Sequence, residues 1–127
     1  ELVGLEDVFP RADIVCLACN LTKDNFHLVD AGRLARMKPD AILVNVARGP
    51  IVDEAALVAA LQAGAIAGAG LDVFEVEPLP TTSPLRDMRN VVLGSHNANN
   101  HFIAVEAVHR RTLDGIEKIL GGSEAGA

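Results

Sequence analysis

The stretch Ala41-Ile-Leu-Val-Asn-Val-Ala-Arg-Gly-Pro-Ile-Val-Asp53 constrains the fold of this chain more than any other segment. Its first part, residues 41–46, is almost entirely apolar and leads directly to Arg48 and Gly49. A short apolar run without polar alternation is typical of a strand covered on both faces, as in a parallel sheet. Asp53 can cap a helix that follows the turn. The stretch therefore predicts a strand that presents a fixed cation at its carboxyl end.

The rest of the chain alternates between similar apolar runs and amphipathic stretches. Strands are expected at 12–19, 41–46, 67–74 and 90–94, and helices at 30–37, 54–63 and about 100–120. This alternation predicts an α/β fold: a partial Rossmann (doubly wound) parallel sheet of about four strands with a long C-terminal helix. Val105, Val108 and Ile116 recur at helical spacing, which predicts one buried stripe on that helix. Residues 1–122 are expected to form the domain and 123–127 a flexible tail.

Composition limits the partners of the chain. It has 127 residues and a net charge of -6 at pH 7, and no cluster of Lys and Arg is long enough to follow a phosphate backbone. Nucleic acid is therefore not expected as a partner, and no apolar run approaches the length of a membrane span. Hydrophobic residues make up 50% of the chain, which suits a single core. The N-terminal residues do not resemble a secretion signal, so a cytoplasmic protein with reduced thiols is predicted.

Two short motifs suggest other chemistries that the expected strands do not support. Cys16 and Cys19 have the C-x-x-C spacing, but positions three apart on a strand point to opposite faces. They are predicted to be small buried residues rather than metal ligands or a disulfide. Gly68-Ala-Gly70 resembles part of a dinucleotide-binding glycine loop, yet it leads into a strand and not into a helix. These glycines are expected to allow close packing.

Polar groups stand where each expected strand ends: Cys19-Asn20, Arg48, Asp72 and His96. The carboxyl ends of parallel strands meet at one edge of a sheet, where ligands bind. An arginine there can bind a carboxylate through two hydrogen bonds, although a lone arginine is more often part of a surface ion pair. His96 can move a proton near neutral pH, or it can be a structural histidine at a strand end. The sequence thus predicts a small-anion site with a proton donor.

Two glutamates are candidates for the partner of His96. Glu77 and Glu75 both lie in the irregular segment between the third and fourth expected strands. Either could hold the tautomer of the imidazole and favour its protonated form, and spacing alone does not choose between them. Asp72 could accept a hydrogen bond from a ligand amide or serve as a turn residue. The other histidines are expected on loops or helix surfaces without a chemical role: His27, His101 and His109.

Several segments together closely resemble the D-isomer-specific 2-hydroxyacid dehydrogenases, the family that includes phosphoglycerate dehydrogenase. They are residues 12–22, 34–39, 42–53, 69–78 and Ser95-His96. They follow the family's order and spacing over nearly the whole chain, so the joint match is far more specific than any single motif. The resemblance implies an oxidoreductase that uses NAD, or alternatively NADP, to interconvert a D-2-hydroxyacid and a 2-oxoacid.

The resemblance also implies roles for individual residues. Arg48 would bind the substrate carboxylate and polarise the carbonyl, and His96 would be the acid and base. The family's glutamate directly precedes a proline, which selects Glu77 over Glu75 as the partner of His96. Contacts to the cofactor would come from Cys19, Asn20, Val46, Ala47, Arg48, Asp72, His96, Asn97, Ala98 and Asn99. The chain departs from the family pattern at Asn20, where proline is usual, and at Ser95-His96-Asn97-Ala98-Asn99, where Pro-His-Ile-Ala/Gly-Gly is usual.

In the family, a substrate domain and the first half of the cofactor domain precede the matching region. The glycine-rich phosphate loop belongs to that part, so residues 1–122 are expected to be the second half of a Rossmann NAD-binding domain, inactive in isolation. Strand 12–19 would then have an open edge. We expect this edge to pair with a second chain in a homodimer, or to be covered by a terminal segment. The alternative function is a non-catalytic, truncated Rossmann module that acts in protein association.

Overall fold

A computed structural model describes residues 1–97 and 101–121 of the chain. The chain divides into two compact units, Glu1–His96 and Asn97–Ala127. The tail expected at 123–127 lies outside the described residues.

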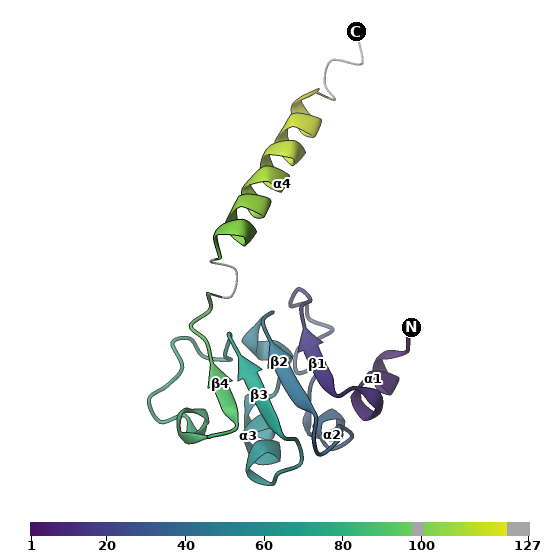
Figure 1. Ribbon diagram of the computed structural model, residues 1–127, viewed down its shortest axis with the longest axis vertical. Coiled ribbons are helices and arrows are strands. Elements are labelled where there is room, and N and C mark those ends of the chain that lie inside the picture. The colour runs from purple at the N-terminus through teal and green to yellow at the C-terminus, as the bar shows by residue number, and fades with distance from the viewer. Residues whose placement is uncertain (98–100, 122–127) are drawn as a thin grey trace. The chain divides into compact units, whose positions relative to one another are not determined.

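The first unit is built on a parallel sheet of four strands in the order β1-β2-β3-β4 (Figure 1). The strands are β1 (Ile14–Leu17), β2 (Ile42–Asn45), β3 (Gly68–Leu71) and β4 (Val91–Leu93). The parallel α/β architecture is confirmed, but every strand is shorter than the sequence predicted. After β3, for example, Val73 and Phe74 are buried in a loop instead of in the ladder, because apolar residues can enter the core without strand pairing. The register places Leu43 between Val15 and Ala69.

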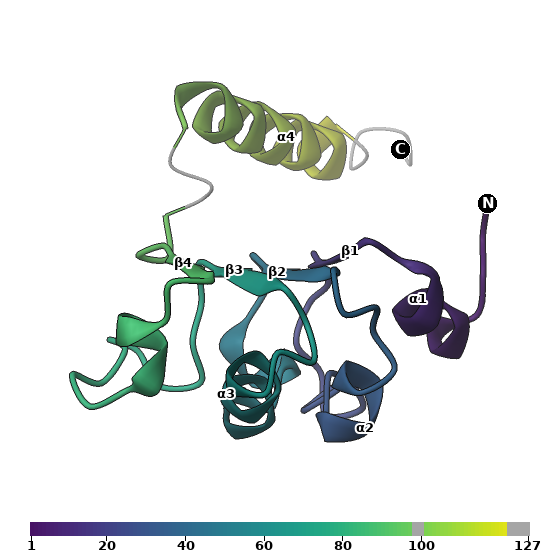
Figure 2. The same cartoon turned by 60° about the horizontal axis from the view of Figure 1, so that its bottom comes forward.

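The helices of this unit lie on one side of the sheet. They are α1 (Leu5–Arg11), α2 (Ala31–Leu34) and α3 (Glu54–Gln62), with the short 3-10 turns η1 (Gly49–Ile51) and η2 (Pro84–Asp87). Figure 2 shows α2 and α3 below the sheet and α1 beside β1. The expected caps are present: Asp30 accepts from the Arg33 amide and Asp53 accepts from the Ala56 amide, each at 2.9 Å. Gly64, in the left-handed region at φ 67°, follows α3 as predicted.

Only one face of the sheet is buried within residues 1–96. Val15 and Leu17 point toward the helices and are buried, whereas Ile14 is 62% exposed and Ile42 is 40% exposed. The expectation of strands covered on both faces is therefore wrong for this unit, because its helices all lie on the other side.

The two cysteines are also not buried as predicted. Cys16 points to the exposed face of β1, and Cys19 lies beyond the end of that strand, so both are exposed free thiols. The close packing predicted for the glycines is confirmed at Gly68, the first residue of β3, where a Cβ would lie 2.6 Å from the carbonyl oxygen of Asn90; at Gly70 a Cβ would meet only Val44, at 3.9 Å.

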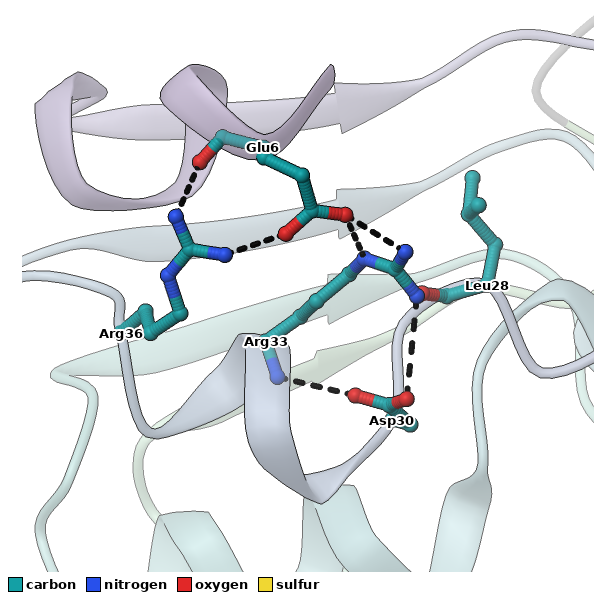
Figure 3. Close-up of polar contacts among 5 residues, drawn as sticks. All are labelled: Glu6, Leu28, Asp30, Arg33 and Arg36. Carbon is teal, nitrogen blue, oxygen red and sulfur yellow. Dashed lines mark hydrogen bonds and ion pairs between the residues drawn. The ribbon is translucent and has the colours of Figure 1, made fainter.

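Glu6 joins α1 to α2 through two arginines (Figure 3). Its carboxylate accepts hydrogen bonds from Arg33 Nη2 at 2.7 Å and Nε at 3.1 Å, and from Arg36, which also donates to the Glu6 carbonyl. Arg33 Nη1 donates to the Leu28 carbonyl at 2.8 Å. The Arg33 guanidinium lies 6.0 Å from the ring centre of Phe9, which is buried in the core. Ion pairs and one buried ring therefore hold the N-terminal helix to the sheet unit.

Glu6→Gln is expected to make the free energy of unfolding fall less steeply as the pH is lowered into the acid range. The hydrogen bond from Arg33, helped by Arg36, lowers the pKa of Glu6 below its ordinary value. The unfolded chain then binds more protons in acid, so the stabilisation is present above the ordinary glutamate pKa and is lost as pH falls through the folded pKa. Urea denaturation from neutral to acid pH measures this. Glu1→Gln, which alters the exposed Glu1–Arg11 pair, is the control; identical acid limbs for wild type and Glu6→Gln would contradict the prediction.

The described part of the second unit consists of Asn97, His101 and α4 (Phe102–Gly121), which confirms the expected long helix. Nothing described within the second unit covers the apolar stripe on this helix, and Val108 is 57% exposed and Ile116 46% exposed. The described residues from 97 onward form no second element against which the stripe could pack within this unit. Within the described ranges, no helix is both long enough and apolar enough to cross a membrane.

Candidate active site

Asn45, a single buried amide at the end of β2, holds the turn that carries Arg48. Its Nδ2 donates to the Arg48 carbonyl at 3.0 Å, and its Oδ1 accepts from the Ala47 amide at 3.1 Å. Arg48 Nη1 in turn donates to the Ala47 carbonyl at 2.6 Å. Asn45 is a polar residue within an apolar run, and this could have marked it in the sequence, but no role was predicted for it. The backbone around Arg48 is thus fixed by a neighbouring side chain.

Gly49 brings this turn against the loop that follows β3. A Cβ at Gly49 would lie 1.9 Å from the carbonyl carbon and oxygen of Phe74 and 2.5 Å from the amide nitrogen of Glu75. Any side chain would therefore collide with backbone, which cannot move aside as a flexible side chain can. The Arg48 turn and the Phe74–Glu75 backbone are in direct contact for this reason.

A cavity of about 470 Å³ opens at the carboxyl ends of β1 and β2. It is lined by Ala18, Cys19, Asn20, Leu21, Val46, Ala47 and Arg48. Asn25 holds the β1 side of this cavity, since its Nδ2 donates to the Asn20 carbonyl at 2.8 Å and its Oδ1 accepts from the Thr22 amide at 2.7 Å. The cavity brings together five of the residues expected to contact a cofactor, and it presents exposed backbone and one guanidinium.

His96 and Glu77 meet after the last strand of the sheet. His96 Nδ1 lies 2.8 Å from Glu77 Oε2, and Glu77 Oε1 accepts from the Phe74 amide at 3.0 Å. The His96 amide donates to the Asp72 carbonyl at 2.8 Å. His96 has φ 58°, a left-handed conformation that is uncommon outside glycine and that recurs at functional sites. Glu77, and not Glu75, is therefore the carboxylate that contacts the imidazole.

The electrostatics of Glu77 favour its ionised form. The hydrogen bond from His96 lowers the pKa of Glu77, the Phe74 amide lowers it further, and the charges of His96 and Arg48 add to the effect. A carboxylate at this position accepts the Nδ1 proton and leaves Nε2 as the second ring nitrogen for chemistry. The arrangement is that of an imidazole whose orientation and tautomer are held by a fixed anion.

His96 and Glu77 also line a cavity of about 520 Å³. Its other lining residues are Phe74, Pro78, Leu79, Arg86, Leu93, Gly94 and Ser95. Arg86 donates to the carbonyls of Pro80, at 2.9 Å, and Leu79, so its guanidinium is engaged by the backbone of this loop. The His96–Glu77 pair therefore borders open space on a mostly apolar wall.

The remaining expected site residues fall outside these two cavities. Asp72 supports His96 through its backbone carbonyl. Asn97 begins the second unit, and Ala98 and Asn99 lie outside the described residues. Among the residues that the structure describes, no group of three or more His, Cys, Asp or Glu side chains could hold a metal ion.

Comparison with known proteins identifies the relatives of this chain. The family profile described as "D-isomer specific 2-hydroxyacid dehydrogenase, NAD binding domain" matches residues 1–98. Glyoxylate/hydroxypyruvate reductase B of Yersinia pestis (strain Pestoides F) is 51% identical over 93 residues, which are 73% of this chain and 28% of that protein. The chain thus spans less than a third of the length of that curated relative.

Two solved structures extend the comparison to the fold. A D-isomer specific 2-hydroxyacid dehydrogenase from Xanthobacter autotrophicus Py2, in complex with NADPH and MES, is 51% identical with a TM-score of 0.71, over 72% of this chain and 29% of that one. The NAD-complexed D-isomer specific 2-hydroxyacid dehydrogenase from Lactobacillus delbrueckii ssp. bulgaricus is 32% identical with a TM-score of 0.78. This match covers 94% of the present chain and 40% of that one. With a profile match over residues 1–98 and a shared fold, this chain belongs to the D-isomer-specific 2-hydroxyacid dehydrogenases and comprises part of their NAD-binding domain.

Proposed function

We propose that this chain supplies the catalytic groups of an NAD(P)-dependent enzyme that interconverts a D-2-hydroxyacid and a 2-oxoacid. The observation that supports it most directly is the His96–Glu77 pair at 2.8 Å, at the same sheet edge as Arg48. A held imidazole and a guanidinium are the groups that reduction of a 2-oxoacid requires from the protein. One must bind the carboxylate, and the other must give a proton to the carbonyl oxygen.

Arg48 is proposed to bind and orient the substrate. Its planar fork of donors matches a carboxylate with two hydrogen bonds, and its charge polarises the adjacent carbonyl. A bound substrate held in one orientation reacts faster because its translational and rotational freedom has already been lost. The fixed turn at Asn45 and Gly49 supports this role, since a mobile arginine would not define an orientation.

His96 is proposed to be the proton donor in reduction and the proton acceptor in oxidation. Glu77 holds Nδ1 and orients the ring, so Nε2 is the nitrogen that can deliver a proton to the carbonyl oxygen of the substrate. The nicotinamide, when bound, supplies the hydride that reaches the carbonyl carbon. In the opposite direction a neutral His96 takes the proton of the hydroxyl group.

The strand-end cavity of about 470 Å³ is proposed to hold the nicotinamide side of the cofactor. Val46 and Ala47 offer backbone groups there, and Cys19 and Asn20 form the opposite wall. Solved relatives in complex with NADPH and with NAD support a dinucleotide as the cofactor. The choice between NAD and NADP, and the cytoplasmic location, stay predictions from sequence.

The 127-residue chain by itself is expected to bind NADH weakly and not to turn over. A pyrophosphate needs backbone amides at a helix N-terminus, and these residues contain no G-x-G-x-x-G segment that would provide them. Isothermal titration calorimetry with NADH measures this, with the Yersinia pestis relative as the positive control. Saturable binding at micromolar NADH would contradict the prediction.

The 127-residue chain is also expected to form a homodimer through β1. Among the described residues β1 pairs only with β2, which leaves one backbone edge for a partner strand. The carbonyls of Asp13 and Leu17 accept from β2, so by strand alternation the Cys16 amide points to the other edge.

Sedimentation equilibrium measures this dimer. Cys16→Pro should shift the equilibrium to monomer without loss of the fold, because it removes only the outward donor, while Cys16→Ser is the matched control. A wild-type chain that is monomeric throughout would contradict the prediction. If the chain dimerises but shows no dehydrogenase activity even when it replaces the matching segment of an active relative, the alternative function, a non-catalytic module for protein association, would be favoured.

A further inference from the structure

His27, a residue without an expected role, is at the centre of a charged cluster beside the candidate site. Its Nε2 lies 2.5 Å from Glu75 Oε1, and its Nδ1 lies 4.0 Å from Asp53 Oδ2. Both side chains of the closer pair are about two-thirds covered. His27 has φ 51°, its amide donates to the Pro50 carbonyl at 2.8 Å, and its ring stacks on Phe26 with 4.0 Å between centres. The imidazole is therefore held by its backbone, its neighbour and two carboxylates.

Glu75 connects this histidine to the start of α3. The Glu75 amide donates to Glu54 Oε2 at 3.2 Å, and the Glu54 amide donates to Glu75 Oε1 at 3.4 Å. Burial raises the pKa of Glu54, and the nearby Glu75 charge adds to that effect. The charged groups that contact His27 are both acidic, Glu75 at 2.5 Å and Asp53 at 4.0 Å, and Glu54 contacts the backbone of Glu75.

The same loop carries Glu77 on its other side. Phe74 donates its amide to Glu77 Oε1, and the backbone of Phe74 and Glu75 packs on Gly49, next to Arg48. Residues 74–77 therefore contact the imidazole of His27 at one point, the Arg48 turn at a second and the imidazole of His96 at a third. A displacement of Glu75 must move the Phe74 amide, and with it the acceptor geometry of Glu77.

We propose that His27 and Glu75 are a positioning pair that fixes residues 74–77 against the Arg48 turn and so sets the contact between Glu77 and His96. The pair touches none of the proposed reacting groups. Its relevance to catalysis rests on the function proposed above, whereas its effect on Glu77 can be measured without any substrate. It also gives a physical reason why two glutamates, Glu75 and Glu77, stand close together in this loop: each has its own histidine.

The test is the titration of the Glu77 carboxyl carbon, followed by carbon-13 NMR in the full 127-residue chain. His27→Asn removes the imidazole while keeping a residue that tolerates the left-handed backbone. Glu75→Gln keeps the size and the acceptor oxygen but removes the charge. In each variant the pKa of Glu77 should rise toward its ordinary value, because the hydrogen bonds from His96 and Phe74 that lower it weaken.

Matched controls make the same chemical changes on α4. His109→Asn replaces an exposed histidine, and Glu106→Gln breaks an exposed ion pair with Arg110 at 2.8 Å. Neither should shift the Glu77 titration. In the double variant His27→Asn/Glu75→Gln the shift should be smaller than the sum of the single shifts, since each single change already breaks the same contact.

A Glu77 titration identical to wild type in a folded His27→Asn or Glu75→Gln chain would overturn the inference, and so would fully additive shifts in the double variant. If His27→Asn does not fold by circular dichroism, the milder Glu75→Gln decides alone. The outcome is independent of turnover: failure of the proposed dehydrogenase activity leaves the titration result standing, and an unchanged titration leaves the activity proposal standing.

Discussion

His96→Asn is expected to lower the rate of 2-oxoacid reduction by about 10²–10⁴-fold, the range typical for loss of a general acid. The assay uses a chimera in which residues 1–98 of this chain, the segment that the family profile matches and that includes His96, replace the matching segment of the 51% identical Yersinia pestis reductase. Asparagine tolerates the left-handed backbone at φ 58°, so the loop should keep its course while the transferable proton is lost.

Steady-state rates with glyoxylate and NADH give the result, and two controls frame it. The chimera with the unchanged segment must be active. The His96→Asn chimera must bind NADH with the same affinity as that unchanged chimera. Under those conditions the loss belongs to the chemical step and not to cofactor binding. A His96→Asn chimera that turns over at the parental rate would remove His96 from the proposed role.

Arg48→Ala is expected to lower kcat/KM in the same chimera by about 10²–10³-fold, as for other groups that stabilise charge in a transition state. Its guanidinium is proposed to contact the substrate in both the bound and the transition state, so KM should rise and kcat should fall. Arg48→Lys restores the charge but not the two-pronged geometry, and should recover only part of the loss.

Arg11→Ala is the matched control for this variant. Arg11 pairs with Glu1 at 2.9 Å on the exposed α1 side, and a surface ion pair of this kind contributes little. Its kcat/KM should equal that of the parent chimera. If Arg48→Ala behaved like Arg11→Ala, the carboxylate of the substrate would have to be bound by another group.

The two proposed catalytic groups depend on one shared contact within the fold. Gly49 and the Phe74–Glu75 backbone pack directly on each other, so the Arg48 turn and the Glu77 loop are in contact. A side chain at Gly49 should therefore disturb both ends of the site, and a change at Glu75 should be felt at Glu77. This coupling explains how residues from separate strands can keep one geometry at a sheet edge.

Features with local causes were predictable from the sequence. Asp30 and Asp53 cap helices because a side-chain oxygen a few residues before an amide needs no distant partner. Gly64 ends α3 for an equally local reason. The parallel order of the strands followed from the alternation of apolar runs and helices, and the position of Arg48 followed from where the apolar run of β2 stops. The family was visible because several such segments agree in order and spacing.

Features that join distant segments were decided only by the tertiary structure. Spacing could not choose between Glu75 and Glu77, because an irregular loop has no period; its path places Glu77 at His96 and Glu75 at His27, 48 residues away in sequence. The exposure of Ile14 and Cys16 depends on which face the helices cover, a property of layers and not of one strand. Sequence alone thus predicted the elements and the candidate groups at their ends, whereas the pairing of those groups came from contacts that exist only once the loops pack together.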